Sequence, residues 1–288
     1  MQCQTGVMTT PSFLSALTGL FARPAAENPT VAMVEAAYRA LGLDARYLTC
    51  DVPPESLGDA VRGAKAMGWL GFNCSLPHKV AVIDHLDEVA ESARLIGAVN
   101  CVVIRNGRLV GENTDGLGFL TSLSRVADPR GARVVLLGAG GAARAIAIEL
   151  ARAGASEIRI VNRAEQRGRE LAAHVAAVTP ARVSFEQWAT PVVVGEADVL
   201  VNATSIGLFP GTAVPDVDFA TLNAGTVVAD VIPNPPHTGF LAAAAERGCD
   251  TIDGLGMLVN QGVIGIRLWT GLEADSAVMH EALSRIFG

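Results

Sequence analysis

Residues 133–162, RVVLLGAGGAARAIAIELARAGASEIRIVN, decide the fold of this chain. An apolar run at 134–137 ends in a glycine-rich turn, and a segment rich in Ala, Ile and Leu follows as far as Gly154. A second apolar run lies at 158–161. Short apolar runs bounded by glycine are typical of buried strands, and the longer segment between them has helical character. The stretch therefore predicts a strand, a tight glycine turn, a helix and a second strand.

The turn in this stretch has the chemistry of a dinucleotide-binding loop. Gly138 permits a sharp turn, Gly140 lacks the Cβ that would block a pyrophosphate, and Ala143 is small enough for close packing of helix on strand. The helix offers free N–H groups and its positive end to phosphates. A tight turn without a ligand is the alternative, and the position of the motif between strand and helix argues against it. The residues expected at the dinucleotide are Gly138, Ala139, Gly140, Gly141 and Ala142.

The end of the second strand predicts which dinucleotide binds. An NAD site usually has an acidic residue there for the ribose 2′-hydroxyl, whereas arginine accommodates a 2′-phosphate. This chain has Asn162 in place of the acid, followed by Arg163 and Arg167. For one arginine alone, an ordinary solvated side chain is an equal alternative. NADP is therefore the first choice of cofactor, and NAD stays open.

Length and composition indicate a two-domain α/β protein. The 288 residues exceed what one compact core usually holds. An apolar content of 50% with 30 glycines and only 5% aromatics suits an Ala, Val and Leu-rich α/β fold. The net charge of −7, without a Lys/Arg run, argues against a nucleic-acid partner.

The cysteines and the hydropathy indicate a cytoplasmic protein without a metal site. Five cysteines are scattered, with no CxxC and no histidine at metal-ligand spacing, as expected of reduced thiols. The amino terminus lacks the pattern of a signal peptide, and no apolar run reaches membrane-spanning length. We therefore expect neither a membrane partner nor a metal. Oligomeric state is left open between monomer and homodimer.

Outside the central stretch, periodicity predicts further elements. Strands are expected at 16–20, 46–50, 69–72 and 199–201, and a hairpin at 101–104 and 109–110 with Asn106-Gly107 as its turn. Helices are expected at 31–41, 55–67, 84–96, 258–271 and 274–287.

Two places in the first half carry candidate chemistry. Pro77 suits the first position of a helix, which puts Lys79 in the first turn, an unfavourable end for a cation and one suited to proton transfer. The alternative is a solvated lysine. Asn100 and Asp115 fall at the two ends of the predicted hairpin, where side chains converge on a shared cleft. The alternative for residues 113–115 is the N-cap of a helix starting near Leu117.

With these segments, the chain resembles the shikimate dehydrogenase family, which includes shikimate, quinate/shikimate and aminoshikimate dehydrogenases. The matching segments, in family order, are NCSLPHK (73–79), GAVN (97–100), ENTDG (112–116), GAGGAAR (138–144), NRAEQR (162–167), NATSIGL (202–208) and GLGMLVNQG (254–262). The resemblance implies an α/β fold of two domains. A substrate domain would comprise residues 1–118 with 255–288, and a Rossmann-type doubly wound parallel sheet for NAD(P) would comprise 119–254.

The resemblance also implies roles for individual residues. Lys79 would move the proton of the substrate hydroxyl, and Asp115 would orient Lys79. Asn100, Ser75 and Gln261 would bind other substrate hydroxyls or the carboxylate, with Asn73 beside them. In the dinucleotide domain, Thr204 and Ser205 end a strand where ligands bind in open parallel sheets, and Gly254 and Met257 would lie near the nicotinamide.

The chain also departs from the family pattern, and the departures concern specificity. Asn28 and Thr30 stand where the family usually has Ser-x-Ser, and Thr30 keeps a hydroxyl that could hold a carboxylate. Pro233 stands where the family usually has a substrate-contacting tyrosine, and Ala164 where it has a cofactor-binding threonine. Small pocket changes of this kind can reassign a substrate. They leave both the substrate and the use of NAD open.

The expected function is NADP-dependent interconversion of 3-dehydroshikimate and shikimate, a step of aromatic amino acid biosynthesis in the family. Quinate or another shikimate-like polyol carboxylate, with NAD or NADP, is the alternative of the same chemistry. A non-catalytic dinucleotide-binding regulator is the alternative of a different class, disfavoured because Lys79 and Asp115 are both present. The segments ENTDG and GMLVNQ argue against a folate-linked dehydrogenase.

Overall fold

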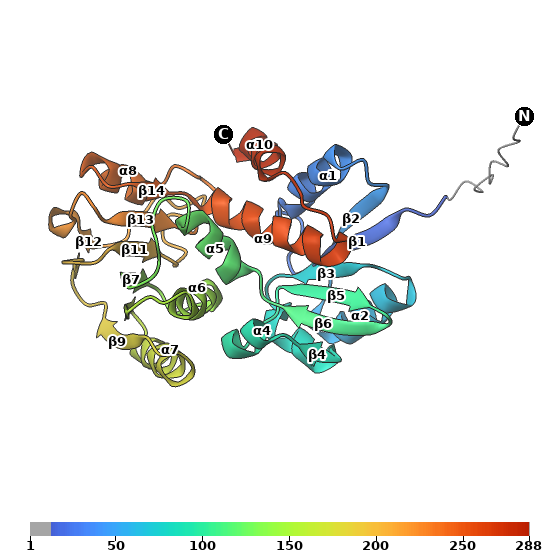
Figure 1. Ribbon diagram of the computed structural model, residues 1–288, viewed down its shortest axis with the longest axis horizontal. Helices are drawn as coiled ribbons and strands as arrows, with labels where there is room; N and C mark the ends of the chain where they lie inside the picture. Colours follow the sequence, from blue (N-terminus) through green and yellow to red (C-terminus); the bar gives the residue numbers. More distant parts are fainter. Residues whose placement is uncertain (1–12, 288) are drawn as a thin grey trace, which may run out of the picture.

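The computed structural model describes residues 13–287, in which two six-stranded sheets lie side by side and are joined by helices (Figure 1). Residues 1–12 of the expected first domain, Cys3 among them, lie outside the described part. The structure thus has the predicted α/β class. No helix within residues 13–287 is long and apolar enough to cross a bilayer.

The first sheet is mixed, with the order β2-β1-β3-β5-β6-β4. β1 is parallel to both β2 and β3, whereas β5 is antiparallel to β3 and to β6, and the short β4 is parallel to β6. The hairpin turn at Asn106-Gly107 is as predicted, with both residues at positive φ. The strands are β1 Ala16–Ala22, β2 Ala45–Asp51, β3 Gly71–Cys74, β4 Glu88–Val89, β5 Cys101–Arg105 and β6 Arg108–Glu112.

Helices cover both faces of the first sheet. On one face α1 (Thr30–Ala40) packs with the two C-terminal helices, α9 (Gly254–Thr270) and α10 (Ser276–Phe287), over a core that includes Leu20 and Tyr47. On the other face α2 (Leu57–Ala66) covers a core built around Phe72. The last two helices therefore return to the first sheet, as the sequence predicts.

The second sheet is wholly parallel, with the order β14-β13-β11-β7-β8-β9. Side chains of α6 (Gly141–Arg152) and α7 (Glu165–Val178) fill one face, and those of α8 (Gly239–Glu246) fill the other. This is the doubly wound arrangement. The strands are β7 Arg133–Leu137, β8 Glu157–Asn162, β9 Arg182–Gln187, β11 Val199–Asn202, β13 Val227–Asp230 and β14 Thr251–Ile252, and a separate pair is formed by β10 Val192–Val193 and β12 Val217–Asp218.

The helix α5 (Asp115–Leu123) lies between the two halves and packs against both α6 and α9 (Figure 1). Two glycines allow this fit. A Cβ on Gly116 would lie 2.4 Å from the carbonyl oxygen of Ala145 on α6. A Cβ on Gly118 would lie 2.8 Å from the backbone nitrogen of Gln261 and the carbonyl oxygen of Met257 on α9. Asp115, the first residue of α5, is thereby set at the junction of the halves.

One predicted element is wrong in extent. The single helix expected at 84–96 is instead a 3₁₀ turn (Val82–His85), the strand β4, and a short α4 (Glu91–Ile96). The side chain of Asp87 accepts a hydrogen bond from the backbone N–H of Leu109, and its own N–H donates to the carbonyl of Leu109. This pairing with the hairpin draws residues 88–89 into the sheet, because a sheet edge satisfies backbone groups that a helix would otherwise pair.

The helix expected after Pro77 is only four residues long, α3 (His78–Ala81), and Pro77 precedes it. A helix of this length has a small dipole, so the argument that the helix end disfavours a cation at Lys79 is weak. The position of Lys79 depends instead on hydrogen bonds. The carbonyl of Lys79 accepts from the N–H of Val99, and the buried ring of His78 bonds the carbonyl of Val52.

Candidate active site

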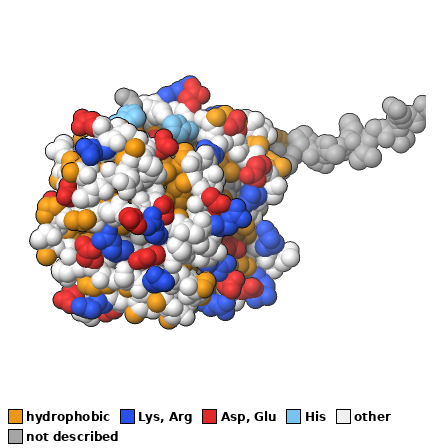
Figure 2. All heavy atoms as spheres, turned by 60° about the vertical axis from the view of Figure 1, so that its left-hand side comes forward, with side chains coloured by type: hydrophobic (Ala, Val, Ile, Leu, Met, Phe, Trp, Pro, Cys, Tyr) orange, Lys and Arg blue, Asp and Glu red, His pale blue; other side chains and the backbone are white. Residues whose placement is uncertain are grey.

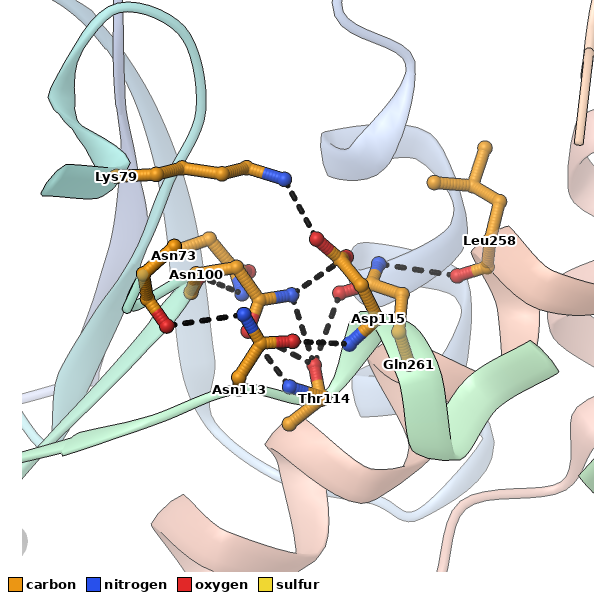
Figure 3. A network of polar contacts seen from close by, with 9 residues as sticks. Asn73, Lys79, Asn100, Asn113, Thr114, Asp115, Leu258 and Gln261 are labelled. Carbon is orange, nitrogen blue, oxygen red and sulfur yellow. Dashed lines mark hydrogen bonds and ion pairs between the residues drawn. The ribbon is translucent and has the colours of Figure 1, made fainter. Parts of the chain in front are cut away.

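An ion pair between Lys79 and Asp115 forms the centre of the site (Figure 3). Lys79 Nζ lies 2.6 Å from Asp115 Oδ2, although the two residues are 36 apart in the chain. Their side chains keep 28% and 15% of their accessible surface, so the pair is sheltered but open to a small ligand. A lysine held this way suits proton transfer to or from a hydroxyl.

Asn100 holds the other oxygen of the same carboxylate. Its Nδ2 donates to Asp115 Oδ1 at 2.7 Å and to the hydroxyl of Thr114 at 3.0 Å. In return, the backbone N–H of Thr114 donates to Asn100 Oδ1 at 2.7 Å. Asn100 is buried at 3% exposure, and such charge-assisted bonds are strong when water is excluded. The carboxylate is therefore fixed from two sides, by Lys79 and by Asn100.

Asn73 and Gln261 extend the polar wall of the site from two further elements (Figure 3). Asn73 on β3 donates from Nδ2 to the carbonyl of Asn100 at 3.0 Å. Gln261 on α9 donates from Nε2 to the carbonyl of Leu258 at 3.0 Å, and its Oε1 accepts from Thr114. The strand β3, the residue just before β5, the start of α5 and the helix α9 thus supply one network.

A small cavity of about 80 Å³ opens onto this network. Asn28 and Thr30 form part of its wall, where Asn28 Oδ1 accepts from the backbone N–H of Thr30 at 3.1 Å. Cys74 and the apolar side chains that line it were not expected from the sequence. The lining residues are Leu20, Asn28, Thr30, Asn73, Cys74, Ser75, Lys79, Asn100, Asp115, Leu258 and Gln261, so every expected catalytic and substrate residue is brought together here.

Cys74 is the one thiol in this lining. Its burial raises the pKa of the thiol to about 12, and the positive charge of Lys79 opposes the rise only in part. The thiol is therefore protonated at neutral pH and acts as a small apolar wall. Within residues 13–287, no group of three or more His, Cys, Asp or Glu side chains could hold a metal ion.

A second cavity, of about 220 Å³, lies at the carboxyl edge of the parallel sheet. It is lined by the β7–α6 turn, by the residues after β8 and by the loop after β11. Of the expected cofactor residues, the lining includes Gly138, Ala139, Gly140, Asn162, Arg163, Arg167, Thr204 and Ser205. Both arginines are exposed, and neither makes an ion pair within the described residues.

The glycine turn has the shape that a dinucleotide needs. Gly138 has φ of +107°, and a Cβ there would lie 2.9 Å from the carbonyl oxygen of Ala203. At Gly140 and Gly141 a Cβ would meet no atom within 4 Å, so the space beside them is open for a ligand. No side chain caps the start of α6, which leaves its N–H groups to phosphate oxygens. These residues fit a dinucleotide cofactor.

The loop after β11 is fixed by a buried network. Thr204 donates from Oγ1 to Asn202 Oδ1 at 2.7 Å, and Asn202 Nδ2 donates to Asp230 Oδ1 at 3.0 Å. Thr238 donates to the other oxygen of Asp230. Burial raises the pKa of Asp230, and these hydrogen bonds oppose the rise. The network ties the ends of β11 and β13 together beside the cofactor cavity.

Trp188 and Ala203 also line this cavity, and Trp188 was not expected from the sequence. Trp188 follows β9, its backbone N–H donates to the carbonyl of Asn162, and its indole donates to the carbonyl of Asp216. Nothing in the sequence analysis pointed to Trp188, because the strand β9 that precedes it was not predicted. A strand at 182–187 would have placed Trp188 at the carboxyl edge, where ligands bind.

Several expected residues lie outside both cavities. Gly141 and Ala142 begin α6 but are not in the lining, and Met257 packs against the core of the second half. Gly254 begins α9, where a Cβ would lie 2.3 Å from the backbone of Ile232, so its smallness serves close packing. Pro233 follows β13 and is half-buried, away from the small cavity.

Larger hollows occur elsewhere on the surface and do not carry comparable chemistry. One of about 290 Å³ surrounds Arg133 at the amino edge of the parallel strands. Arg133 already pairs with Glu196 and Asp198 there. On the face shown in Figure 2, basic and acidic side chains are likewise interspersed.

Comparison with known proteins agrees with this geometry. Three family models match the chain: the shikimate dehydrogenase substrate binding domain over residues 20–102, shikimate / quinate 5-dehydrogenase over residues 122–209, and the shikimate 5′-dehydrogenase C-terminal domain over residues 254–283. The chain belongs to the shikimate dehydrogenase family. It is an oxidoreductase of that family, and the predicted fold is confirmed.

Individual relatives differ in substrate. A shikimate dehydrogenase (NADP(+)) of Shouchella clausii is 40% identical over 268 residues, which is 92% of this chain and 96% of the relative. The ligand-free structure of 5-ketofructose reductase from Gluconobacter sp. strain CHM43 is 60% identical with a TM-score of 0.94, over 96% of this chain and 100% of the other. Shikimate 5-dehydrogenase from Listeria monocytogenes, in complex with shikimate and NAD, is 32% identical with a TM-score of 0.87, over 93% and 96%.

Proposed function

We propose that this chain is an NADP-dependent alcohol dehydrogenase that interconverts 3-dehydroshikimate and shikimate at the Lys79–Asp115 pair. The observation that carries the proposal is the 2.6 Å ion pair in a cavity lined by amides and hydroxyls. Such a lining suits a compact polyhydroxylated substrate, because each hydroxyl needs a polar partner when water is excluded. The name of the Shouchella clausii relative and the shikimate in the Listeria monocytogenes structure support the same pair of substrate and product.

Each polar side chain has a part in this reaction. In the reduction of the carbonyl, the ammonium group of Lys79 gives a proton to the carbonyl oxygen. In the oxidation of the alcohol, the neutral amine left after release of that proton takes the hydroxyl proton and becomes the ammonium again. Asp115 holds Lys79 in place and accepts a neighbouring substrate hydroxyl, while Asn100 keeps the carboxylate from turning. Asn28, Thr30, Asn73, Ser75 and Gln261 bind the rest of the substrate. NADP, when bound, accepts or supplies the hydride.

The cofactor would lie along the second cavity. The β7–α6 turn and the first residues of α6, Gly138 to Ala142, would hold the pyrophosphate, with Thr204 and Ser205 beside it. Arg163 and Arg167, beside Asn162, receive the 2′-phosphate, which favours NADP over NAD. Gly254 and Met257, by resemblance to the family, would lie near the nicotinamide.

A second candidate function is the NADP-dependent reduction of 5-ketofructose. The 60% identity to the Gluconobacter reductase exceeds the 40% to the curated shikimate dehydrogenase of Shouchella clausii. In addition, Asn28 and Thr30, which differ from the usual family residues, lie in the wall of the substrate cavity. Quinate, with NAD or NADP, is a third substrate of the same chemistry.

The deciding experiment compares initial rates, followed by NADPH or NADH absorbance, on purified protein. Shikimate and quinate are each offered with NADP⁺ and with NAD⁺, and 5-ketofructose is offered with NADPH. Turnover of shikimate with NADP⁺ supports the first proposal. Turnover of 5-ketofructose without turnover of shikimate overturns it in favour of the second. If none of the three reacts while NADP⁺ still binds, both proposals are wrong.

We also propose the domain boundaries, the cellular location and the oligomeric state of the enzyme. The substrate domain comprises residues 1–118 with 255–288, and the dinucleotide domain comprises 119–254. The first boundary then falls within α5, which both halves share. The described cysteines, Cys50, Cys74, Cys101 and Cys249, are all free thiols, which supports a cytoplasmic enzyme. The enzyme would be active as a monomer or homodimer.

A further inference from the structure

Tyr47 is buried behind the substrate cavity and reaches its wall without lining it. It lies on β2, two strands away from β3 in the sheet order, and keeps only 3% of its accessible surface. Its hydroxyl donates to Asn73 Oδ1 at 2.7 Å. Asn73, by contrast, is one of the residues that line the cavity. The tyrosine therefore meets the side-chain amide of Asn73 from the side away from the substrate.

The two partners of Asn73 fix the orientation of its amide group. A carbonyl only accepts hydrogen bonds, so the carbonyl of Asn100, 3.0 Å away, requires the nitrogen of Asn73 on its side. The oxygen must then face Tyr47, whose hydroxyl donates to it. Rotation of the amide by 180° would bring oxygen against oxygen at Asn100. The bond to Asn100 is lost if the group turns, and the Tyr47 hydroxyl would then have to accept from the amide nitrogen instead of donating to the amide oxygen.

This orientation leaves one donor of Asn73 for a ligand. An asparagine amide nitrogen has two N–H groups, and the bond to Asn100 uses one of them. The other has no partner within the described residues. Because Asn73 lines the cavity, this N–H is available to a substrate hydroxyl or carbonyl oxygen.

We infer that Tyr47 is a positioning residue for substrate binding, which acts by orienting the amide of Asn73. The chain of contacts runs from Tyr47 through Asn73 to Asn100, and from Asn100 to the carboxylate of Asp115. Without the tyrosine hydroxyl, the oxygen of Asn73 is left buried without its partner, and the amide gains freedom to turn. Substrate binding weakens, while Lys79 and Asp115 keep their own contacts.

Tyr38 provides a matched control in the same core. It is also buried, at 1% exposure, and its hydroxyl makes one side-chain hydrogen bond, to Thr18 Oγ1 at 2.7 Å. Neither Tyr38 nor Thr18 lines the substrate cavity. Tyr38→Phe and Tyr47→Phe therefore each remove one buried hydroxyl and one hydrogen bond, and only the second removes the partner of a substrate residue.

The experiment measures KM and kcat for the parent, Tyr47→Phe, Tyr38→Phe, Asn73→Ala and the double variant Tyr47→Phe/Asn73→Ala, with the substrate that the parent turns over. We expect Tyr47→Phe to raise the substrate KM about fivefold with little change in kcat or in the KM for NADP. Tyr38→Phe should leave the substrate KM unchanged. In the Asn73→Ala background, Tyr47→Phe should change the KM by less than about twofold, because its effect passes through Asn73.

An equal rise in KM from Tyr47→Phe in both backgrounds would overturn the inference, as would an equal effect of Tyr38→Phe. The kinetic readout rests on the proposed function, so a second readout is independent of turnover. In ¹⁵N-labelled protein, the side-chain amide signals of Asn73 are those absent from Asn73→Ala. They should shift or broaden in Tyr47→Phe and stay unchanged in Tyr38→Phe, and an unchanged signal in Tyr47→Phe would equally overturn the inference.

Discussion

At the scale of single residues, Lys79 carries the proposed proton transfer. Replacing it with Met keeps an apolar stem of similar length and removes the ammonium group that meets Asp115 at 2.6 Å. We expect kcat to fall by about a hundredfold or more, as is usual on loss of a general acid or base. Initial-rate assays at saturating substrate check this, with cofactor binding followed by fluorescence.

Lys65→Met is the matched control for Lys79→Met. Lys65 also pairs with an aspartate, Asp87, at 3.6 Å, but on the surface of α2 and away from the cavity. Its replacement should leave kcat near the parent value. A Lys79→Met enzyme that turns over at the parent rate would contradict the assigned role.

Arg163 and Arg167 are the residues that we expect to select NADP. Both line the cofactor cavity, and neither has a carboxylate partner in the described chain. The double variant to Ala should lower the preference for NADP⁺ over NAD⁺, measured as a ratio of kcat/KM values, by at least about tenfold, because two charge-assisted contacts to phosphate are lost. Arg169 lies on α7, as Arg167 does, but it pairs with Glu165, so Arg169→Ala should preserve the ratio. Equal ratios in the parent and the double variant would rule out this assignment.

At the scale of elements, a buried hydrogen bond between Tyr38 and Thr18 joins α1 to β1. Burial raises the pKa of Tyr38 to about 12, against 10.0 for an unperturbed tyrosine. Its contribution to stability is fully present below pH 10 and is lost as the pH rises toward 12, because the unfolded chain releases the proton first. The loss amounts to about 3 kcal/mol at most.

Urea unfolding at pH 8 and at pH 11 tests this contribution of Tyr38. Tyr38→Phe should be less stable than the parent at pH 8, where it lacks the bond to Thr18. At pH 11 the difference should shrink, since phenylalanine has no proton to release. A stability difference that is the same at both pH values would show that folding does not raise the pKa of Tyr38.

At the scale of the whole molecule, α5 fixes the position of the two halves relative to each other, because it packs against both α6 and α9. Gly116 faces α6 of the second sheet, and Gly118 faces α9, which covers the first. Changing either glycine to Ala forces a methyl group against backbone atoms. We expect each change to cost about 1–3 kcal/mol of unfolding free energy and to lower kcat, because Asp115 begins this helix.

Gly63→Ala is the control for these two glycine variants. Gly63 lies within α2, and a Cβ there would meet only the end of the Met67 side chain, 3.9 Å away. Alanine should stabilise this helix, by up to about 1 kcal/mol. Urea unfolding and initial rates of the three variants, measured together, separate helix propensity from packing. Gly116→Ala and Gly118→Ala proteins as stable as the parent would contradict the proposed role of α5.

The secondary-structure elements around the glycine turn, in the second half of the molecule, were predicted more accurately than those in the first half. The β7, α6 and β8 elements follow prediction closely, because a parallel strand buried on both faces gives a continuous apolar run and the turn requires glycine. Residues 84–96 were wrongly expected to form one helix, since pairing of β4 with the hairpin is a long-range interaction. Trp188 was missed for a related reason, because β9 alternates weakly and lies at the edge of the sheet.

The sequence by itself determined the glycine turn, the arginines after β8 and the candidacy of Lys79, Asp115 and Asn100, because these depend on local chemistry and order along the chain. Only the tertiary structure decided that Lys79 and Asp115 touch, that Asn100 holds the carboxylate, and that Tyr47 orients Asn73 from behind. These contacts join β2, β3, α3, α5 and the residue just before β5. Hydrogen bonds act over about 3 Å, so they depend on how strands and helices pack, which local sequence does not specify.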